Sequence, residues 1–185
     1  KSGNLNLGIA GIMYVGGVSG VIGAFFYERA VESINPVLGI LIPLLCTLVG
    51  SALMALIYSF LTITLRANQN VTGLALTTLG TGIGNLVGGS LATVFGEGGS
   101  IALVETSKLF RTTLPFTDNL GPIGSIFFSY GFLAYVAIII AVVAGYILSK
   151  TRVGLNLRAV GERPATADAA GFSVAKYEYM ATIIG

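Results

Sequence analysis

Four long stretches of the chain carry no charged side chain, and they limit what this sequence can fold into more than any other feature. A helix needs about 20 predominantly apolar residues to cross the hydrocarbon core of a bilayer. The stretches predict membrane spans over approximately 7–27, 37–63, 71–95 and 126–149, with a fifth span starting within 173–185. In lipid the backbone must satisfy its own hydrogen bonds, so we expect each span to be a helix.

The composition agrees with a membrane protein and excludes several other classes. Of the 185 residues, 54% are hydrophobic and 10% are charged, whereas a soluble domain has about 25% charged residues. The net charge of +2 gives no reason to expect a nucleic-acid partner. With no histidine and one cysteine, Cys46, the chain cannot form an internal disulfide, and neither a metal site nor another cofactor is expected. The predicted class is an all-α polytopic transmembrane helical bundle.

The two ends of the sequence suggest a fragment. The chain starts at Lys1 rather than at a methionine, and it ends inside the apolar run from Tyr179 to Gly185. We therefore expect an internal part of a longer polypeptide, with spans missing at one or both ends.

Basic residues predict the orientation, because lysine and arginine are enriched in cytoplasmic loops. The most basic stretch follows the fourth span, from Lys150 to Glu178, and contains Lys150, Arg152, Arg158, Arg163 and Lys176. This predicts a cytoplasmic loop over 150–171. Counting back through the spans places residues 97–125 outside, where a short helix is expected around 101–110.

The third stretch differs from the others because it is rich in glycine. Its six glycines are Gly73, Gly80, Gly82, Gly84, Gly88 and Gly89. Glycine weakens a helix by roughly 1 kcal/mol relative to alanine in water. Two interpretations stay open: a continuous helix whose glycines permit close helix packing, or a broken helix that lines a polar path.

Polar side chains in or beside the spans are the candidates for a solute cavity, namely Asn4, Asn6, Thr81 and Asn85. An amide offers both a donor and an acceptor, which suits a hydroxyl-rich or nucleobase-like ligand. The alternative for Asn4 and Asn6 is that they cap the first helix. The sequence contains no catalytic constellation and no phosphate-binding P-loop. The four spans also lack the buried acid or arginine that commonly marks ion-driven transport.

A short helix is expected inside the basic loop. Pro164 suits the first position of a helix, and Gly171 suits the position just after one. The alanines between them would present a surface of small side chains to a partner. The alternative is an ordinary solvated loop.

This loop carries a family resemblance. Residues 152–162, followed by Ala167-Asp168-Ala169-Ala170-Gly171, resemble the cytoplasmic loop of ABC-importer permeases. The similarity is greatest to the branched-chain amino acid and simple-sugar permease family, and within it to nucleoside-type permeases that work with a lipoprotein binding component. Residues 3–11 and 66–69 also resemble that group, so the likeness covers nearly the whole chain.

The resemblance implies a permease subunit that moves a nucleoside or a related sugar-like solute by alternating access. It implies separate cytoplasmic ATPase subunits, a second permease subunit that is identical or paralogous, an external solute-binding lipoprotein, and the bacterial cytoplasmic (inner) membrane. The residues that would touch the ATPase are Glu162, Pro164, Ala167, Asp168, Ala169, Ala170 and Gly171. Asp168 stands where the general importer motif often has glutamate. The alternatives are an ATP-independent secondary carrier or channel for a small polar solute, or a structural membrane subunit.

Overall fold

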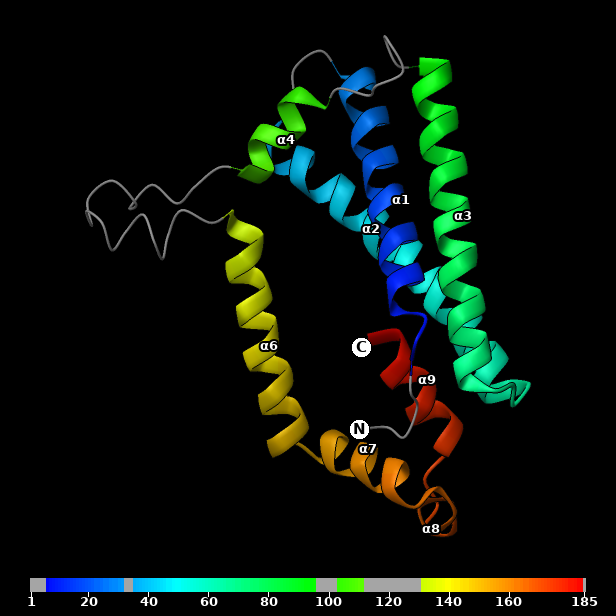
Figure 1. Cartoon of the computed structure of the whole chain (residues 1–185). Helices are drawn as coiled ribbons and strands as arrows, with labels where there is room; N and C mark the ends of the chain where they lie inside the picture. Colours follow the sequence, from blue (N-terminus) through cyan, green and yellow to red (C-terminus); the bar gives the residue numbers. More distant parts are fainter. Residues whose placement is uncertain (1–5, 32–34, 96–102, 112–130, 185) are drawn as a thin grey trace, which may run out of the picture.

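The regular structure in the part of the chain that is described is helical throughout. The computed structural model describes residues 6–31, 35–95, 103–111 and 131–184. The elements in chain order are α1 (Ile9–Ala30), α2 (Pro36–Ser59), the π-helix η1 (Phe60–Thr64), α3 (Gln69–Phe95), α4 (Val104–Arg111), α6 (Phe132–Lys150), α7 (Arg152–Glu162), α8 (Pro164–Ala169) and α9 (Val174–Ile184) (Figure 1). The predicted all-α class is therefore confirmed.

Among the described residues, four helices are long and apolar enough to cross a membrane, as judged by length and composition. They are Ile9–Ala30, Pro36–Thr64, Gln69–Leu91 and Leu133–Lys150. The second includes η1, which continues α2 without a break. The start predicted for the fourth span, residues 126–130, lies outside the described residues. α9 occupies the start of the predicted fifth span over 11 residues.

Small residues bring α1 and α2 together. At Gly16, Gly20 and Gly23 of α1, the space that a Cβ would need is taken by Ser51, Thr47 and Cys46 of α2, respectively. Such close approach favours helix association in lipid, where packing replaces the hydrophobic effect as the driving force. The Ser19 hydroxyl adds a polar contact, at 2.9 Å from the Cys46 carbonyl oxygen.

α3 is one uninterrupted helix of 27 residues, which decides between the two interpretations of its glycines in favour of continuity. It packs on α1 through Gly80 and Gly84, and its Gly73 lies against Leu7 and Gly8, just before α1. A Cβ at Gly80 would lie 2.7 Å from the Gly11 Cα atom, so the two backbones nearly touch there. At Gly82, Gly88 and Gly89, by contrast, no other described residue beyond the helix's own backbone comes within 4 Å of the Cβ position.

The connection between α2 and α3 is tight. Arg66 adopts a left-handed conformation with φ of 51°. The Asn68 side-chain oxygen then accepts hydrogen bonds from the backbone amides of Asn70, at 3.0 Å, and Val71, at 3.4 Å. Asn68 thereby caps the first turn of α3.

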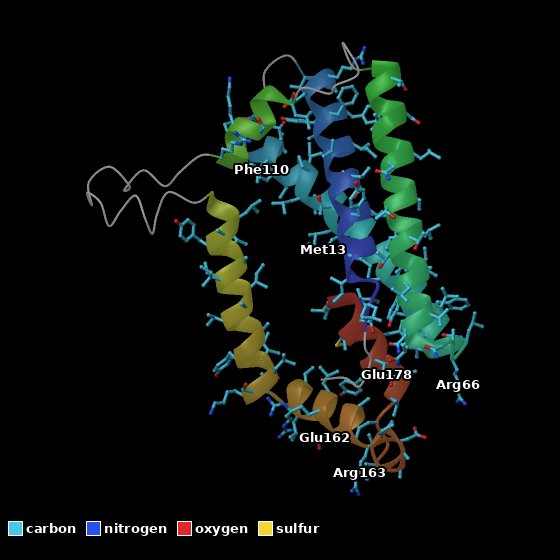
Figure 2. The ribbon with its side chains drawn as sticks, in the orientation of Figure 1. Met13, Arg66, Phe110, Glu162, Arg163 and Glu178 are labelled. Atoms are coloured by element: carbon cyan, nitrogen blue, oxygen red, sulfur yellow. The ribbon has the colours of Figure 1, made fainter. Side chains whose placement is uncertain are left out.

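The remaining helices pack unevenly around α1, α2 and α3. Among the described elements α6 contacts only α4 and α7, and no residue in its apolar window is buried. Its surface is therefore available to lipid or to other helices. α7, α8 and α9 pack on one another, and α9 returns to α2 and η1. Arg66, Glu162 and Arg163 lie at one end of the molecule, whereas α4 lies at the other (Figures 1 and 2).

Candidate functional site

A groove of about 520 Å³ runs between α1 and α3. Met13, Tyr14 and Gly17 line it from α1, and Asn85, Gly88 and Gly89 line it from α3. The glycines deepen it, because within the described part of the chain nothing beyond the backbone of the same helix lies within 4 Å of the Cβ position at Gly17, Gly88 or Gly89. Figure 2 labels Met13 near the lower end of α1, where this helix begins. The groove is mostly apolar, so the few polar groups that line it decide which solute it could hold.

Two side chains supply those polar groups. The Tyr14 hydroxyl donates a hydrogen bond to the Asn85 side-chain oxygen across 3.4 Å, which is long for such a bond. The Tyr14 ring lies over Gly84, in the space that a Cβ at that position would need. The exposed Asn85 retains an amide nitrogen as a donor. An aromatic ring beside an amide suits a solute that has both a flat face and polar edges.

The other cavity candidates do not join Asn85 in this groove. The Asn6 side-chain oxygen accepts a hydrogen bond from the Gly8 amide at 2.9 Å, so Asn6 supports the turn that begins α1. The Thr81 hydroxyl donates to the Thr77 carbonyl of its own helix at 3.1 Å, and Thr81 is absent from the described groove lining. Asn4 lies outside the described residues.

Tyr14 was missed by sequence reasoning. A tyrosine beside two glycines in an otherwise apolar span was the available signal, because its hydroxyl needs a partner in lipid. The partner itself could not be found, because the crossing of α1 and α3 decides which side chains meet.

The segment that resembles an ATPase-coupling loop forms a compact helix. α8 begins at Pro164 and ends at Ala169. Gly171 follows it with φ of 86°, a conformation that glycine adopts without strain. The Phe172 amide donates to the Ala167 carbonyl at 3.0 Å, and the Gly171 amide donates to the Asp168 carbonyl at 2.9 Å. These two bonds define a Schellman motif, which satisfies the last carbonyls of the helix.

One face of α8 is buried against the protein, and the other face is exposed. Ala167 is buried, with 4% of its surface exposed, and Val160 of α7 is buried nearby on the neighbouring helix. Asp168, Ala169 and Ala170 are exposed, as are Glu162 and Pro164. The exposed set gives a short surface of small side chains with acidic groups at Glu162 and Asp168.

α7 is a second element that sequence reasoning missed. The sequence analysis predicted a helix only from Pro164 onward, but residues 152–162 are also helical. The Thr151 hydroxyl accepts a hydrogen bond from the Gly154 amide at 3.4 Å and caps the helix. A threonine before a segment with one apolar face was the signal that could have predicted it.

Side-chain hydrogen bonds connect α7 to α9, and α9 to the end of the second membrane helix. The Asn156 amide of α7 donates to the Tyr177 hydroxyl of α9 at 3.0 Å. Two residues further along α9, the Tyr179 hydroxyl lies 2.5 Å from the Thr64 hydroxyl at the end of η1. α9 thus joins α7 and α8 to the end of the second membrane helix.

Comparison with known proteins gives relatives along the whole chain. It is 30% identical over 185 residues to the guanosine ABC transporter permease protein NupQ of Bacillus subtilis, and 34% identical over 185 residues to the nucleoside ABC transporter permease protein NupC of Lactococcus lactis. It is also 36% identical over 190 residues to TsgC13 of Haloferax volcanii, an ABC transporter permease protein provisionally named for glucose.

These matches cover all of this chain but only 55%, 55% and 51% of the respective relatives, so it spans about half their length. No solved structure matches the chain. The family described as the branched-chain amino acid transport system permease component matches residues 1–185. With its four apolar helices, the chain is a multi-pass membrane protein and belongs to this permease family.

Proposed function

We propose that the chain is part of the membrane-spanning subunit of an ABC importer, and that this importer takes up a nucleoside or a related sugar-like solute. The observation that carries the proposal is the surface of α8. Asp168, Ala169 and Ala170 are exposed on it, while Ala167 is buried. A surface of small side chains lets a partner approach closely. The partner is a cytoplasmic ATP-binding-cassette ATPase, and the permease itself performs no chemistry.

The connections of α8 support a route for the movement. A force on α8 would reach α7 and α9, because the three helices pack on one another. From α9 it would pass to η1 and α2 through Tyr179 and Thr64. Since α1 packs on both α2 and α3, the movement would change the crossing that shapes the groove. Solute that entered from one side of the membrane would then leave on the other side. This mechanism is alternating access.

The substrate class rests on the groove and on the relatives. Tyr14 offers a ring and Asn85 an amide, a pairing that fits a nucleobase or a sugar ring with hydroxyl groups. NupQ and NupC are named for guanosine and nucleosides. The remaining partners would be an identical or paralogous permease subunit and an external solute-binding lipoprotein, and the location would be the bacterial inner membrane.

The deciding experiment measures whether uptake needs the ATPase. The complete transporter is reconstituted with its ATPase and binding protein, and labelled guanosine uptake is followed with and without ATP. A Walker-site variant of the ATPase should abolish uptake while the complex still assembles. Guanosine uptake that continues with the inactive ATPase would instead favour an ATP-independent carrier.

A further inference from the structure

The end of the second membrane helix has an unusual hydrogen-bond pattern. α2 passes into the five-residue π-helix η1, where the Leu65 amide donates to the Phe60 carbonyl, five residues earlier, at 3.1 Å. In an α-helix the same amide would bond the Leu61 carbonyl, four residues earlier. π-Helices are rare, and single π-helical turns within α-helices are frequently found at functional sites. The wider turn at this point therefore calls for an explanation.

The Leu61 carbonyl is bonded by a different donor. It accepts a hydrogen bond from the Ala67 amide at 3.0 Å. This bond closes a turn through Arg66, whose φ of 51° lies in the left-handed region that residues other than glycine seldom adopt (Figure 2). Two donors thus compete for one oxygen: Ala67 bonds it in this structure, and Leu65 would bond it if η1 became α-helical. The end of the helix therefore has two discrete arrangements.

The two sides of η1 are held differently. Before it, Tyr58 and Ser59 have no exposed surface, and Tyr58 packs in the hydrophobic core with Leu76 of α3. After it, Leu65 and Arg66 are exposed. The start of η1 is therefore fixed within the protein, whereas its end has room to change its hydrogen bonds.

A side chain from a distant part of the sequence contacts this end. The Tyr179 hydroxyl of α9 lies 2.5 Å from the Thr64 hydroxyl. Among the described elements, α9 contacts α2, η1, α7 and α8 but neither α1 nor α3. A displacement of α7 and α8 that moves α9 would therefore act first on the end of the second membrane helix.

We propose that residues 60–67 form a switch segment, and that the contact between Thr64 and Tyr179 controls which of its two hydrogen-bond arrangements is occupied. With the contact made, η1 keeps its π-helical turn. When α9 moves and the contact breaks, the Leu65 amide takes the carbonyl that Ala67 now bonds. The chain then leaves α2 in a different direction, which changes how α3 lies on α1. The inference rests on the proposed function for the source of the movement, which is the ATPase.

Thr64 and Tyr179 are then positioning residues. Neither is among the described residues that line the groove between α1 and α3. Loss of their contact should therefore leave the affinity for solute unchanged. It should instead lower the number of solute molecules that are moved for each ATP hydrolysed.

The first test measures hydrogen exchange of backbone amides in the complete transporter without ATP. Tyr179→Phe keeps the ring and removes the hydroxyl, so the Ala67 amide should exchange about fivefold faster, the effect of one lost hydrogen bond on a local equilibrium. Thr64→Val should have the same effect, whereas Thr64→Ser keeps a hydroxyl and should exchange at the wild-type rate. The Thr72 amide, which bonds the Asn68 carbonyl at 2.9 Å in α3, should be unaffected in every variant.

Tyr146→Phe is the matched control for the loss of a tyrosine hydroxyl. Tyr146 is exposed on α6, and α6 contacts neither η1 nor α9 among the described elements. This variant should leave the exchange of the Ala67 amide unchanged. Equal exchange rates at Ala67 in Thr64→Val and Thr64→Ser would overturn the proposal, because the hydroxyl contact would then have no influence on the switch segment.

The second test adds the ATPase. In the complete transporter with a Walker-site variant that binds ATP without hydrolysing it, addition of ATP should speed exchange of the Ala67 amide at least threefold. With the active ATPase, Tyr179→Phe should lower guanosine uptake per ATP hydrolysed at least threefold while KM for guanosine stays at the wild-type value. A raised KM with an unchanged uptake per ATP would place Tyr179 in the solute path and overturn its positioning role.

The outcomes separate the switch segment from the proposed function. ATP-dependent guanosine uptake, with exchange at Ala67 that responds neither to ATP nor to Tyr179→Phe, would leave the proposed function intact and overturn the switch. Faster exchange in Tyr179→Phe, in a transporter whose uptake ignores the ATPase, would support control of the segment by the contact and contradict the proposed function.

Discussion

At the scale of single residues, the contact between Gly11 and Gly80 has the clearest consequence. Glycine ordinarily destabilises a helix, so its presence in α1 and α3 needs a reason. The reason is that the two backbones approach more closely than any side chain would permit. A Cβ at Gly80 would lie 2.5 Å from the Gly11 carbonyl oxygen and 2.7 Å from its Cα atom. Both neighbours are backbone atoms, which cannot rotate away.

Gly80→Ala should therefore destabilise the protein by about 1–3 kcal/mol through overpacking. Gly82→Ala is the matched control on the same helix, because no described residue outside the backbone of α3 lies within 4 Å of its Cβ position. That change should be neutral or should stabilise α3 by up to about 1 kcal/mol. Thermal unfolding of the two purified variants in the same detergent measures the difference. Equal melting temperatures would show that α1 and α3 do not cross at this point.

The pair of Tyr14 and Asn85 makes a second prediction at this scale. Asn85→Leu should weaken guanosine uptake by about five- to tenfold with normal membrane insertion, because the solute loses an amide partner. Tyr14→Phe should have a smaller effect, since the ring stays on Gly84 and only the hydroxyl is lost.

Asn6→Leu is the contrasting variant, because its side chain bonds the Gly8 amide rather than lining the groove. It should lower stability and leave the apparent affinity for solute unchanged. Uptake kinetics that stay at wild-type values in Asn85→Leu would remove this residue from the solute path.

At the scale of elements, the sequence predicted helices wherever a single local signal decided the outcome. The long apolar helices followed from the lengths of charge-free runs, and α8 followed from the positions of Pro164 and Gly171. α7 was missed because the positive charges of the loop were used to predict its side of the membrane and not its secondary structure. The groove could not be predicted, because it depends on how α1 and α3 cross, which is a property of two helices together.

α8 also makes the prediction that tests coupling. Ala170 is exposed just before the glycine that ends the helix. Ala170→Trp should leave membrane insertion normal, because surface substitutions usually change stability by no more than about 0.5 kcal/mol. Uptake should be lost, and loaded binding protein should no longer stimulate the ATPase, because the large side chain blocks docking.

Ala175→Trp on α9 is the control, since Ala175 is also an exposed alanine at this end of the molecule. It should retain uptake and stimulation. Full uptake by the Ala170→Trp protein would mean that the ATPase docks elsewhere or not at all.

At the scale of the whole molecule, α4 and α8 lie at opposite ends (Figure 1). If residues 150–171 are cytoplasmic, as their basic side chains predict, α4 must face outward. In a chain that carries Cys46→Ser, a cysteine at Lys108 should react with a membrane-impermeant thiol reagent in intact cells. A cysteine at Thr166 should react only after the membrane is permeabilised. Labelling of the Thr166 variant from outside would reverse the orientation.

The isolation of α6 has a consequence for how the protein is made. α1, α2 and α3 pack on one another, whereas α6 contacts only α4 and α7 among the described elements. The earlier three helices can therefore assemble in the bilayer while the later part of the chain is still being synthesised. α9 then packs against α2 after α6 to α8 have left the ribosome. The order of translation would thus be the order of assembly, and a ribosome stalled after residue 131 should already hold α1 to α3 in their final arrangement.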